Sequence, residues 1–241
     1  RAVPLEELRR QACSLPKGDF AFERAMGKEG LSFICECKRA SPSKGLIALE
    51  FPYLQIAREY EAAGADGISV LTEPKWFLGS DQYLQEIARA VSVPCLRKDF
   101  TVDAYMIYQA KVLGASAVLL ICSILTQGQL TDYLHLCDER GPSALGEIPD
   151  EAEGETAPGA GARMVGVNNR NLKDFSVDTD NSRRLRAMIP DDVLFISESG
   201  IRDSGDVTLL RALGADGVLV GETLMRAADK KVALAKLRGG V

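Results

Sequence analysis

The stretch AGADGISVL at residues 63–71 decides the fold, because the chain repeats its pattern three more times. The other copies are LGASAVLLI (113–121), AGARMVGV (160–167) and LGADGVLVG (213–221). In each copy a helix that ends in glycine leads through alanine into a short apolar run typical of a buried strand. The repeated glycines follow one another at steps of 50, 47 and 53 residues. Each step has room for two strand–helix units, so the repeat predicts a chain built from such units.

Apolar runs and helical patterns alternate along the rest of the chain. The runs expected to form strands are 32–38, 67–73, 94–100, 117–123, 143–148, 164–170, 193–199 and 217–222. The stretches expected to form helices, with apolar residues at three- and four-residue spacing, are 52–64, 80–91, 103–114, 126–141 and 203–214. Near-continuous apolar strands are typical of a parallel sheet that is covered on both faces.

Eight strands alternating with helices in about 250 residues predict an α/β protein, a (β/α)8 TIM barrel. We expect a single domain over 1–241 with a short helical extension at about 1–30. A doubly wound open sheet is the structural alternative. The stretch 150–163 holds three glycines and one proline, so it is expected to be a short, frayed helix or a loop.

The composition excludes several classes of function. The chain has 29 Lys+Arg against 34 Asp+Glu, and a net charge of −5 argues against a general nucleic-acid or membrane binder. No apolar run approaches the roughly 20 residues that span a bilayer. The single histidine, His135, makes a two-histidine zinc site impossible, so we expect acid–base chemistry from lysine and glutamate, without metal or cofactor. The six cysteines form no C-x-x-C pair and are expected to be core thiols in a reducing compartment.

Charged and polar residues fall repeatedly at the ends of the expected strands. They are Glu36, Lys38, Lys98, Glu147, Asn168, Arg170, Glu198 and Glu222. In a (β/α)8 barrel these ends surround the active site. Glu36 and Lys38 are two residues apart, so both side chains point the same way. A solvated rim or structural ion pairs would explain one such charge, but charges on five strands favour a catalytic site in which lysine and glutamate shift one another's pKa.

Small residues follow the last two expected strands. Ser199 and Gly200 come after the seventh strand, and Gly221 ends the eighth. Glycine lets backbone N–H groups approach phosphate oxygens, and a helix N-terminus that follows adds its dipole. These residues therefore indicate a phosphate site, although glycine is also common in turns.

With these residues in view, the chain resembles the indole-3-glycerol phosphate synthases of tryptophan biosynthesis over essentially its whole length. The motifs that carry the resemblance are CECKRASPSKG (35–45), LTEPKWFLGS (71–80), LRKDFTVDAYMIYQAKVLGASAVLLI (96–121), VGVNNRNLKDF (165–175), ISESGI (196–201) and GVLVGETLMRA (217–227). The resemblance implies a carboxy-lyase that closes, decarboxylates and dehydrates 1-(2-carboxyphenylamino)-1-deoxyribulose 5-phosphate. It implies a small phosphorylated substrate as the partner, and a cytoplasmic enzyme, monomeric or weakly homo-oligomeric.

The resemblance also implies catalytic roles for the strand-end residues. Lys98 would be the general acid that protonates the carbonyl during ring closure, and Glu147 would be the acid–base in dehydration. Lys38 would lie near the reacting groups, while Glu36 and Glu198 would hold and tune the lysines. These roles match the need for proton transfer without histidine.

Further positions correspond to binding residues of the family. Asn168 would orient a substrate hydroxyl or carboxylate, and Ser41 lies in a loop that helps to receive the carboxylate. The residues expected to bind phosphate are Arg170, Ser199, Gly200, Gly221 and Glu222, the last through its backbone N–H. The residues expected to wall the anthranilate ring are Phe77, Phe100, Leu119, Ile121 and Leu172.

Three departures from the family pattern stand out. Gly146 and Pro149 flank Glu147 where the family usually reads L-V-E-x-H, which bears on strand geometry. The second departure is the Gly-rich segment 154–161. The third is at the N-terminus, where the family generally has a longer extension, so we expect the natural chain to be longer at its N-terminal end.

Two rival functions remain open at this point. One is a phosphosugar isomerase or an aldolase-type barrel in which Lys98 forms a Schiff base. The other is a noncatalytic barrel that only binds phosphorylated metabolites.

Overall fold

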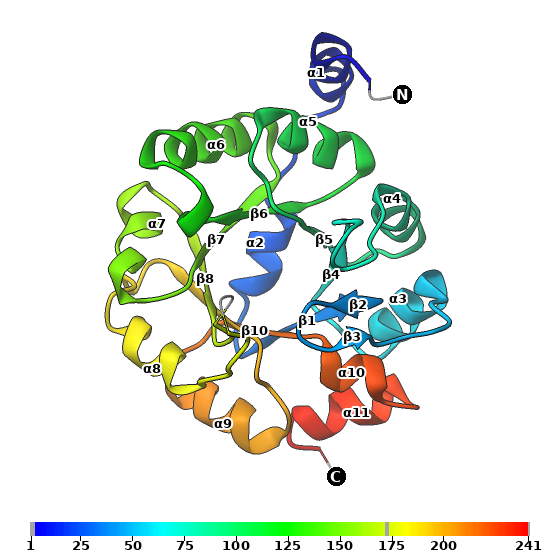
Figure 1. Ribbon diagram of the computed structural model, residues 1–241, viewed down its shortest axis with the longest axis vertical. Helices are drawn as coiled ribbons and strands as arrows, with labels where there is room; N and C mark the ends of the chain where they lie inside the picture. Colours follow the sequence, from blue (N-terminus) through cyan, green and yellow to red (C-terminus); the bar gives the residue numbers. More distant parts are fainter. Residues whose placement is uncertain (1–2, 172–173, 241) are drawn as a thin grey trace.

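The chain forms a closed barrel of parallel strands with helices on the outside (Figure 1). A computed structural model describes residues 3–171 and 174–240. Within them eight strands pair in the closed order β1-β10-β9-β8-β7-β6-β5-β4. The strands are β1 (Ser32–Cys37), β4 (Gly67–Leu71), β5 (Cys95–Lys98), β6 (Ala117–Ile121), β7 (Ser143–Ile148), β8 (Met164–Asn168), β9 (Leu194–Glu198) and β10 (Gly217–Val220). The (β/α)8 prediction is confirmed, and closure between β1 and β10 excludes the open sheet.

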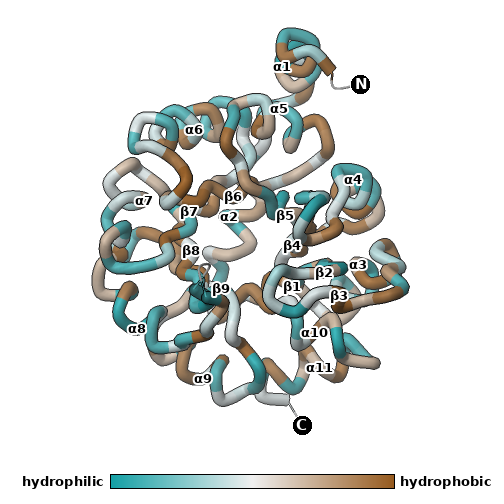
Figure 2. The backbone as a smooth tube through the Cα atoms, in the orientation of Figure 1, coloured by the Kyte–Doolittle hydropathy of each residue, from teal (hydrophilic) through white to brown (hydrophobic). Residues whose placement is uncertain are grey.

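Helices follow the strands and cover the outside of the barrel. They are α3 (Tyr53–Ala62), α4 (Asp81–Ala90), α5 (Ala104–Leu113), α6 (Gln127–Arg140), α7 (Thr156–Gly159), α8 (Asp180–Arg186), α9 (Ser204–Ala212), α10 (Glu222–Arg226) and α11 (Lys230–Leu237). In Figure 2, β6 is hydrophobic along its length, whereas α6 mixes polar and apolar segments, as expected for a helix with one buried face. The weak stretch 150–163 forms only the 3-10 turn Glu151–Glu153 and the short α7.

The repeated Gly-Ala motif has a structural cause in the backbone. All four repeat glycines have left-handed φ, between 76° and 91°, which ends the preceding helix. In two copies an aspartate then ties the new strand to its neighbour. Asp66 Oδ2 accepts from Phe33 N at 2.8 Å, and Asp216 Oδ2 accepts from Phe195 N at 2.7 Å. The motif therefore fixes both the end of a helix and the start of the next strand.

The bottom of the barrel is closed by α2 (Ala21–Met26), which crosses the middle of the ring in Figure 1. Phe22 and Met26 are fully buried among the inward side chains of the strands. Gly67 and Gly217 make room for them, because a Cβ on Gly67 would lie 2.9 Å from the Phe22 ring and one on Gly217 would lie 3.4 Å from Met26 Sδ. The open end is thus the opposite one, at the carboxyl ends of the strands.

The remaining elements lie at the edges of the barrel. The helix α1 (Leu5–Ser14) packs outside α5, where Tyr105 Oη donates to Val3 O at 3.0 Å. The strands β2 (Ala40–Ser41) and β3 (Gly45–Leu46) form a small hairpin after β1.

Several composition-based expectations can be compared with this structure. Five of the six cysteines are buried free thiols and Cys13 is exposed, while His135 lies on the exposed side of α6. In the part of the chain that the structure describes, none of the helices has the length and apolar character needed to cross a membrane. Among the same residues, no group of three or more His, Cys, Asp and Glu side chains is arranged to hold a metal ion.

Candidate active site

A cavity of about 950 Å³ opens at the carboxyl ends of the barrel strands. The residues predicted for the site that line this cavity are Glu36, Lys38, Ser41, Phe77, Lys98, Phe100, Leu119, Ile121, Glu147, Asn168, Arg170, Glu198, Ser199, Gly200, Gly221 and Glu222. Leu172 lies outside the described residues. The structure therefore brings together residues from all eight barrel strands and the loops after them, up to 186 positions apart in the sequence.

The end of β1 contributes a buried ion pair. Lys38 Nζ lies 2.6 Å from Glu36 Oε1, as the two-residue spacing predicts. Ser69 Oγ donates to the other oxygen, Glu36 Oε2, at 3.4 Å. Burial by itself raises the pKa of Glu36, but Lys38 and Lys98 outweigh it and hold the pKa below its ordinary value. Gly221 leaves space for this pair, because a Cβ there would lie 2.5 Å from Glu36 Oε1.

Lys98 lies at the centre of the charged cluster, at the end of β5. Its ammonium is paired with Glu198, and its distance to Glu147 Oε2 is 3.4 Å. Burial lowers the pKa of Lys98, but attraction to Glu198, Glu147 and Glu36 outweighs that effect and raises the pKa above its ordinary value. Lys98 is therefore a protonated lysine that can donate a hydrogen bond or a proton.

Glu198 is a buried carboxyl group whose pKa lies well above its ordinary value. Burial, together with repulsion from Glu147 and Glu36, raises its pKa to about 7 despite the attraction of Lys98. Its Oε1 has no hydrogen-bond partner among the described residues and lies against Gly166, where a Cβ would overlap it. Such a carboxyl can exchange a proton near neutral pH.

Glu147 occupies the place expected for it in spite of its neighbours. The strand β7 runs unbroken over Ser143–Ile148, and Glu147 is buried with Asn168 Nδ2 donating to its Oε1 at 3.4 Å. Gly146 faces the other way, where its missing Cβ would lie 3.0 Å from Ala157 of α7. The glycine thus lets the short α7 approach the strand. Although residues 145–149 differ from the family pattern, Glu147 still lines the cavity.

Another part of the cavity is formed by the segments that follow β8, β9 and β10. Ser199 and Gly200 both have left-handed φ, 67° and 78°, and form the turn after β9. Arg170 borders the cavity and donates to Phe175 O at 3.1 Å. Glu222 begins α10, and its carboxylate lies 3.6 Å from Lys44 Nζ and 3.1 Å from Arg226 Nε. The side chain of Glu222 therefore pairs with these two cations.

Apolar side chains form a further part of the cavity wall. Leu119 and Ile121 are two residues apart on β6, both face the barrel interior and both are buried. Phe77 and Phe100 are tilted toward each other with ring centroids 6.3 Å apart. A flat aromatic ring can be held between these side chains, next to the lysine–glutamate cluster.

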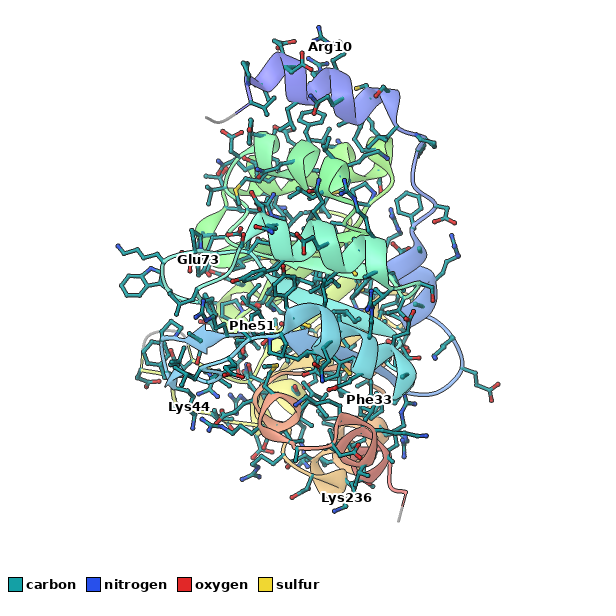
Figure 3. All side chains as sticks on the ribbon, turned by 90° about the vertical axis from the view of Figure 1, so that its right-hand side faces the viewer. Arg10, Phe33, Lys44, Phe51, Glu73 and Lys236 are labelled. Carbon is teal, nitrogen blue, oxygen red and sulfur yellow. The ribbon has the colours of Figure 1, made fainter. Side chains whose placement is uncertain are left out.

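Glu73, which the sequence analysis did not single out, organises the loop that carries Phe77. Its carboxylate accepts from the backbone N–H groups of Lys75, Trp76 and Phe77, at 2.8, 2.6 and 3.0 Å. Figure 3 places Glu73 and Lys44 toward the same end of the barrel, the left end in that view. An acidic residue just before a proline turn, as in TEPKWF, was the available signal.

Further cavity residues that sequence reasoning missed are the cations Lys44, Arg202 and Arg226. Lys44 and Arg202 lie in loops after strands and Arg226 ends α10, so their approach to the cavity depends on how these segments fold back. The alternation of residues along strands therefore does not predict that these three cations lie at the cavity.

Comparison with known proteins gives a consistent result. The family described as indole-3-glycerol phosphate synthase matches residues 1–237. A protein of that name from Ruminiclostridium cellulolyticum is 57% identical over 223 residues, which are 92% of this chain and 86% of that protein. Another, from Leuconostoc mesenteroides, is 51% identical over 238 residues, which are 98% of this chain and 91% of that protein.

Among solved structures, the crystal structure of a 3-hexulose-6-phosphate synthase is similar with a TM-score of 0.68. The sequence identity is 15%, and the match covers 87% of this chain and 99% of that one. At that identity the similarity concerns the barrel fold alone.

Proposed function

This chain belongs to the indole-3-glycerol phosphate synthase family, and we propose that the lysine–glutamate cluster around Lys98 performs the chemistry of its reaction. The substrate is 1-(2-carboxyphenylamino)-1-deoxyribulose 5-phosphate, and the products are indole-3-glycerol phosphate, carbon dioxide and water. The enzyme is a carboxy-lyase of tryptophan biosynthesis. The substrate is anionic at its carboxylate and at its phosphate, so the cations on both sides of the cavity suit it.

In ring closure, the aromatic carbon that bears the carboxylate attacks the ketone carbon of the sugar chain. Lys98 donates a proton to the ketone oxygen as the new carbon–carbon bond forms, so the oxygen becomes a hydroxyl rather than an alkoxide. The carbon–carboxylate bond then breaks, and its electrons restore the aromatic ring as carbon dioxide leaves. The support is that Lys98 is held protonated by three carboxylates and lies beside the apolar wall.

In dehydration, the hydroxyl leaves as water while a proton is removed from the adjacent carbon. Glu147 serves as the acid–base, oriented by Asn168, and Lys38 lies near the reacting groups. Glu36 and Glu198 hold and tune the two lysines. Both proton transfers use side chains whose charged states depend on one another.

Binding is divided between the polar ends and the apolar wall. Ser41 receives the substrate carboxylate, and Asn168 also orients a hydroxyl. The residues proposed to bind phosphate are Arg170, Ser199, Gly200, Gly221 and, through its backbone N–H, Glu222. The residues proposed to enclose the aromatic ring are Phe77, Phe100, Leu119, Ile121 and Leu172.

The single observation that carries this proposal is the placement of Lys98 between Glu147 and Glu198 at the mouth of the barrel. It also disfavours the Schiff-base aldolase, because a lysine must lose its proton to act as a nucleophile and these carboxylates oppose that loss. A barrel that only binds metabolites has no need of a buried lysine with paired carboxylates, which are costly to bury.

The deciding experiment follows the fluorescence of indole-3-glycerol phosphate as it forms from the carboxyphenylamino substrate. We expect turnover by the folded protein without added metal or cofactor. No turnover by a well-folded full-length chain would overturn the proposal. Borohydride trapping of the protein with a sugar phosphate would instead support the Schiff-base alternative.

The proposal extends to the location, domain organisation and oligomeric state of the enzyme. We place it in the cytoplasm, which suits a biosynthetic enzyme with buried free thiols. We propose that residues 1–241 act as one domain, with an extension at about 1–30, and that the protein is a monomer or a weak homo-oligomer. Sedimentation measurements across a range of concentrations test the last point.

A further inference from the structure

Beside Lys98 lies a largely buried polar network that the proposed mechanism does not use and of which one member, Asp99, borders the cavity. Arg97 and Asp99, the two chain neighbours of Lys98, meet there with Thr72, the residue after β4. The Arg97 side chain is 4% exposed and that of Asp99 is 10% exposed. Charged groups buried to this degree are costly unless every partner is present, so the geometry of such a network is strongly specified.

The hydrogen bonds of the network close around the backbone of Lys98. Thr72 Oγ1 accepts from Arg97 Nε at 3.2 Å and donates to Asp99 Oδ2 at 2.5 Å. Asp99 Oδ2 also accepts from Arg97 Nη2 at 3.4 Å. The backbone N–H of Thr72 donates to Lys98 O at 3.1 Å. The side chains of both chain neighbours of Lys98 and the carbonyl group of Lys98 itself are therefore tied to Thr72.

The same carboxylate also reaches the aromatic wall of the cavity. Asp99 Oδ1 accepts from the backbone N–H of Phe100 at 2.8 Å. Phe100 in turn contacts Phe77 through the ring pair described above. Asp99 thus accepts hydrogen bonds at both carboxylate oxygens. Oδ2 accepts from Thr72 and Arg97, and Oδ1 accepts from the backbone N–H of Phe100 in the aromatic wall.

The molecule offers a matched comparison for Asp99. Arg97 Nη2 also donates to Asp81 Oδ1, at 2.9 Å, so two carboxylates share one guanidinium nitrogen. Asp81 lies in the first turn of α4, and its other oxygen accepts from Gln109 of α5. These hydrogen bonds link Asp81 to Arg97 and to the outer helices, so we expect its loss to affect the packing of the barrel shell rather than the cavity.

We propose that Asp99 is a positioning residue: through Thr72 and the N–H of Phe100 it sets the place of the Lys98 ammonium and of the aromatic wall relative to each other. This inference rests on the proposed function of Lys98 as general acid. The reason is that Lys98 must reach the ketone oxygen in the sugar chain of a substrate whose aromatic ring is held against Phe100. An error of about 1 Å between the two can cost about 100-fold in rate.

The test compares Asp99→Asn with Asp81→Asn in the full chain. Both changes keep the shape of the side chain and remove one carboxylate from Arg97. We expect Asp99→Asn to lower kcat by about 10-fold or more and Asp81→Asn to leave kcat within about 2-fold. Thermal unfolding of both variants by circular dichroism reports their structural cost, which we expect to be similar because they share a partner.

The pH profile gives a readout that a structural role alone would not move. Attraction to the carboxylates of the cavity raises the pKa of Lys98, although burial opposes it, and a displaced ammonium loses part of that attraction. The basic limb of kcat should therefore move to lower pH in Asp99→Asn and stay in place in Asp81→Asn. If Asp99→Asn fails to fold, Thr72→Val removes the bridging hydroxyl with little change of shape and should show the same two effects.

Equal kcat values and equal pH profiles for the two aspartate variants would overturn the inference, and so would an equal loss in both. In those outcomes the wild-type protein still converts its substrate, so the proposed function stands. Absence of turnover in the folded wild-type protein would instead overturn the proposed function, and this inference with it.

Discussion

At one side of the cavity Lys98 and Glu198 are buried, with side chains 13% and 2% exposed, whereas at the other side Glu222 and Lys44 are 30% and 44% exposed. Both sides consist of lysine or arginine beside glutamate. In the buried cluster each charge is felt strongly by its neighbours, because little water is present to screen it. At the exposed side the same type of pair contributes roughly 0–1 kcal/mol. We therefore propose that charge serves proton transfer on the buried side and capture of an anion on the exposed side.

The largest effect should come from removing the centre of the buried cluster. We expect Lys98→Ala to lower kcat by about 10²- to 10⁴-fold, the usual contribution of a general acid, with substrate binding largely retained. Steady-state kinetics, together with substrate binding followed through the fluorescence of the single tryptophan, Trp76, would measure both. Activity near that of the wild-type protein would show that the general acid has been assigned wrongly.

A glycine variant tests whether the buried cluster depends on exact spacing. We expect Gly166→Ala to lower kcat by about 10- to 100-fold, because the new methyl group displaces the Glu198 carboxylate from Lys98. Gly128→Ala in α6 is the matched control, since a Cβ there meets nothing within 4 Å. The spacing argument fails if the two variants have the same kcat.

The raised pKa of Glu198 predicts that the free energy of unfolding depends on pH through this buried carboxyl group. Burial raises this pKa from 4.5 to about 7, so the folded state holds a proton that the unfolded chain loses first. The stabilisation is complete below pH 4.5 and is lost as pH rises to about 7. Compared with Glu198→Gln, the wild-type protein should therefore lose stability between these values. Denaturant unfolding of both proteins at pH 5 and pH 8 measures the change, and a constant difference would argue against the raised pKa.

The smallest effect is expected at the exposed side. Glu222→Gln removes a negative charge beside the proposed phosphate site, so KM should fall by about 2- to 5-fold, as for a screened surface charge, with kcat unchanged. The gain should shrink at high salt. Asp138→Asn, which breaks an exposed pair with Arg163 away from the cavity, is the control and should leave KM unchanged. A KM that rises in Glu222→Gln would mean that the carboxylate itself contributes to binding.

Much of the buried side could be predicted from the sequence. Strand periodicity placed Glu36 and Lys38 on one face, and the strand ends placed Lys98, Glu147 and Glu198 at one rim. These predictions needed only the regular geometry of parallel strands, which is the same wherever such strands occur. The roles of these residues stay predictions until the kinetic experiments are done.

The exposed side and the supporting contacts could not be predicted in this way. Arg202 and Arg226 line the cavity because of how their segments fold back, and no short-range pattern encodes that path. Glu73 acts on backbone N–H groups of its own loop, and Asp99 acts on a neighbouring strand through Thr72. Both are ordinary acidic residues in the sequence, and their partners appear only in three dimensions.

The sequence by itself determined the barrel, since the repeated glycines must end helices in the left-handed region and the apolar runs that follow must be buried. It also predicted that lysine and glutamate, rather than histidine, carry the acid–base chemistry. The tertiary structure decided which carboxyl has a raised pKa, which ion pair is exposed, and which contacts surround Lys98. Those properties depend on burial and on distances between strands, which arise only when the barrel closes.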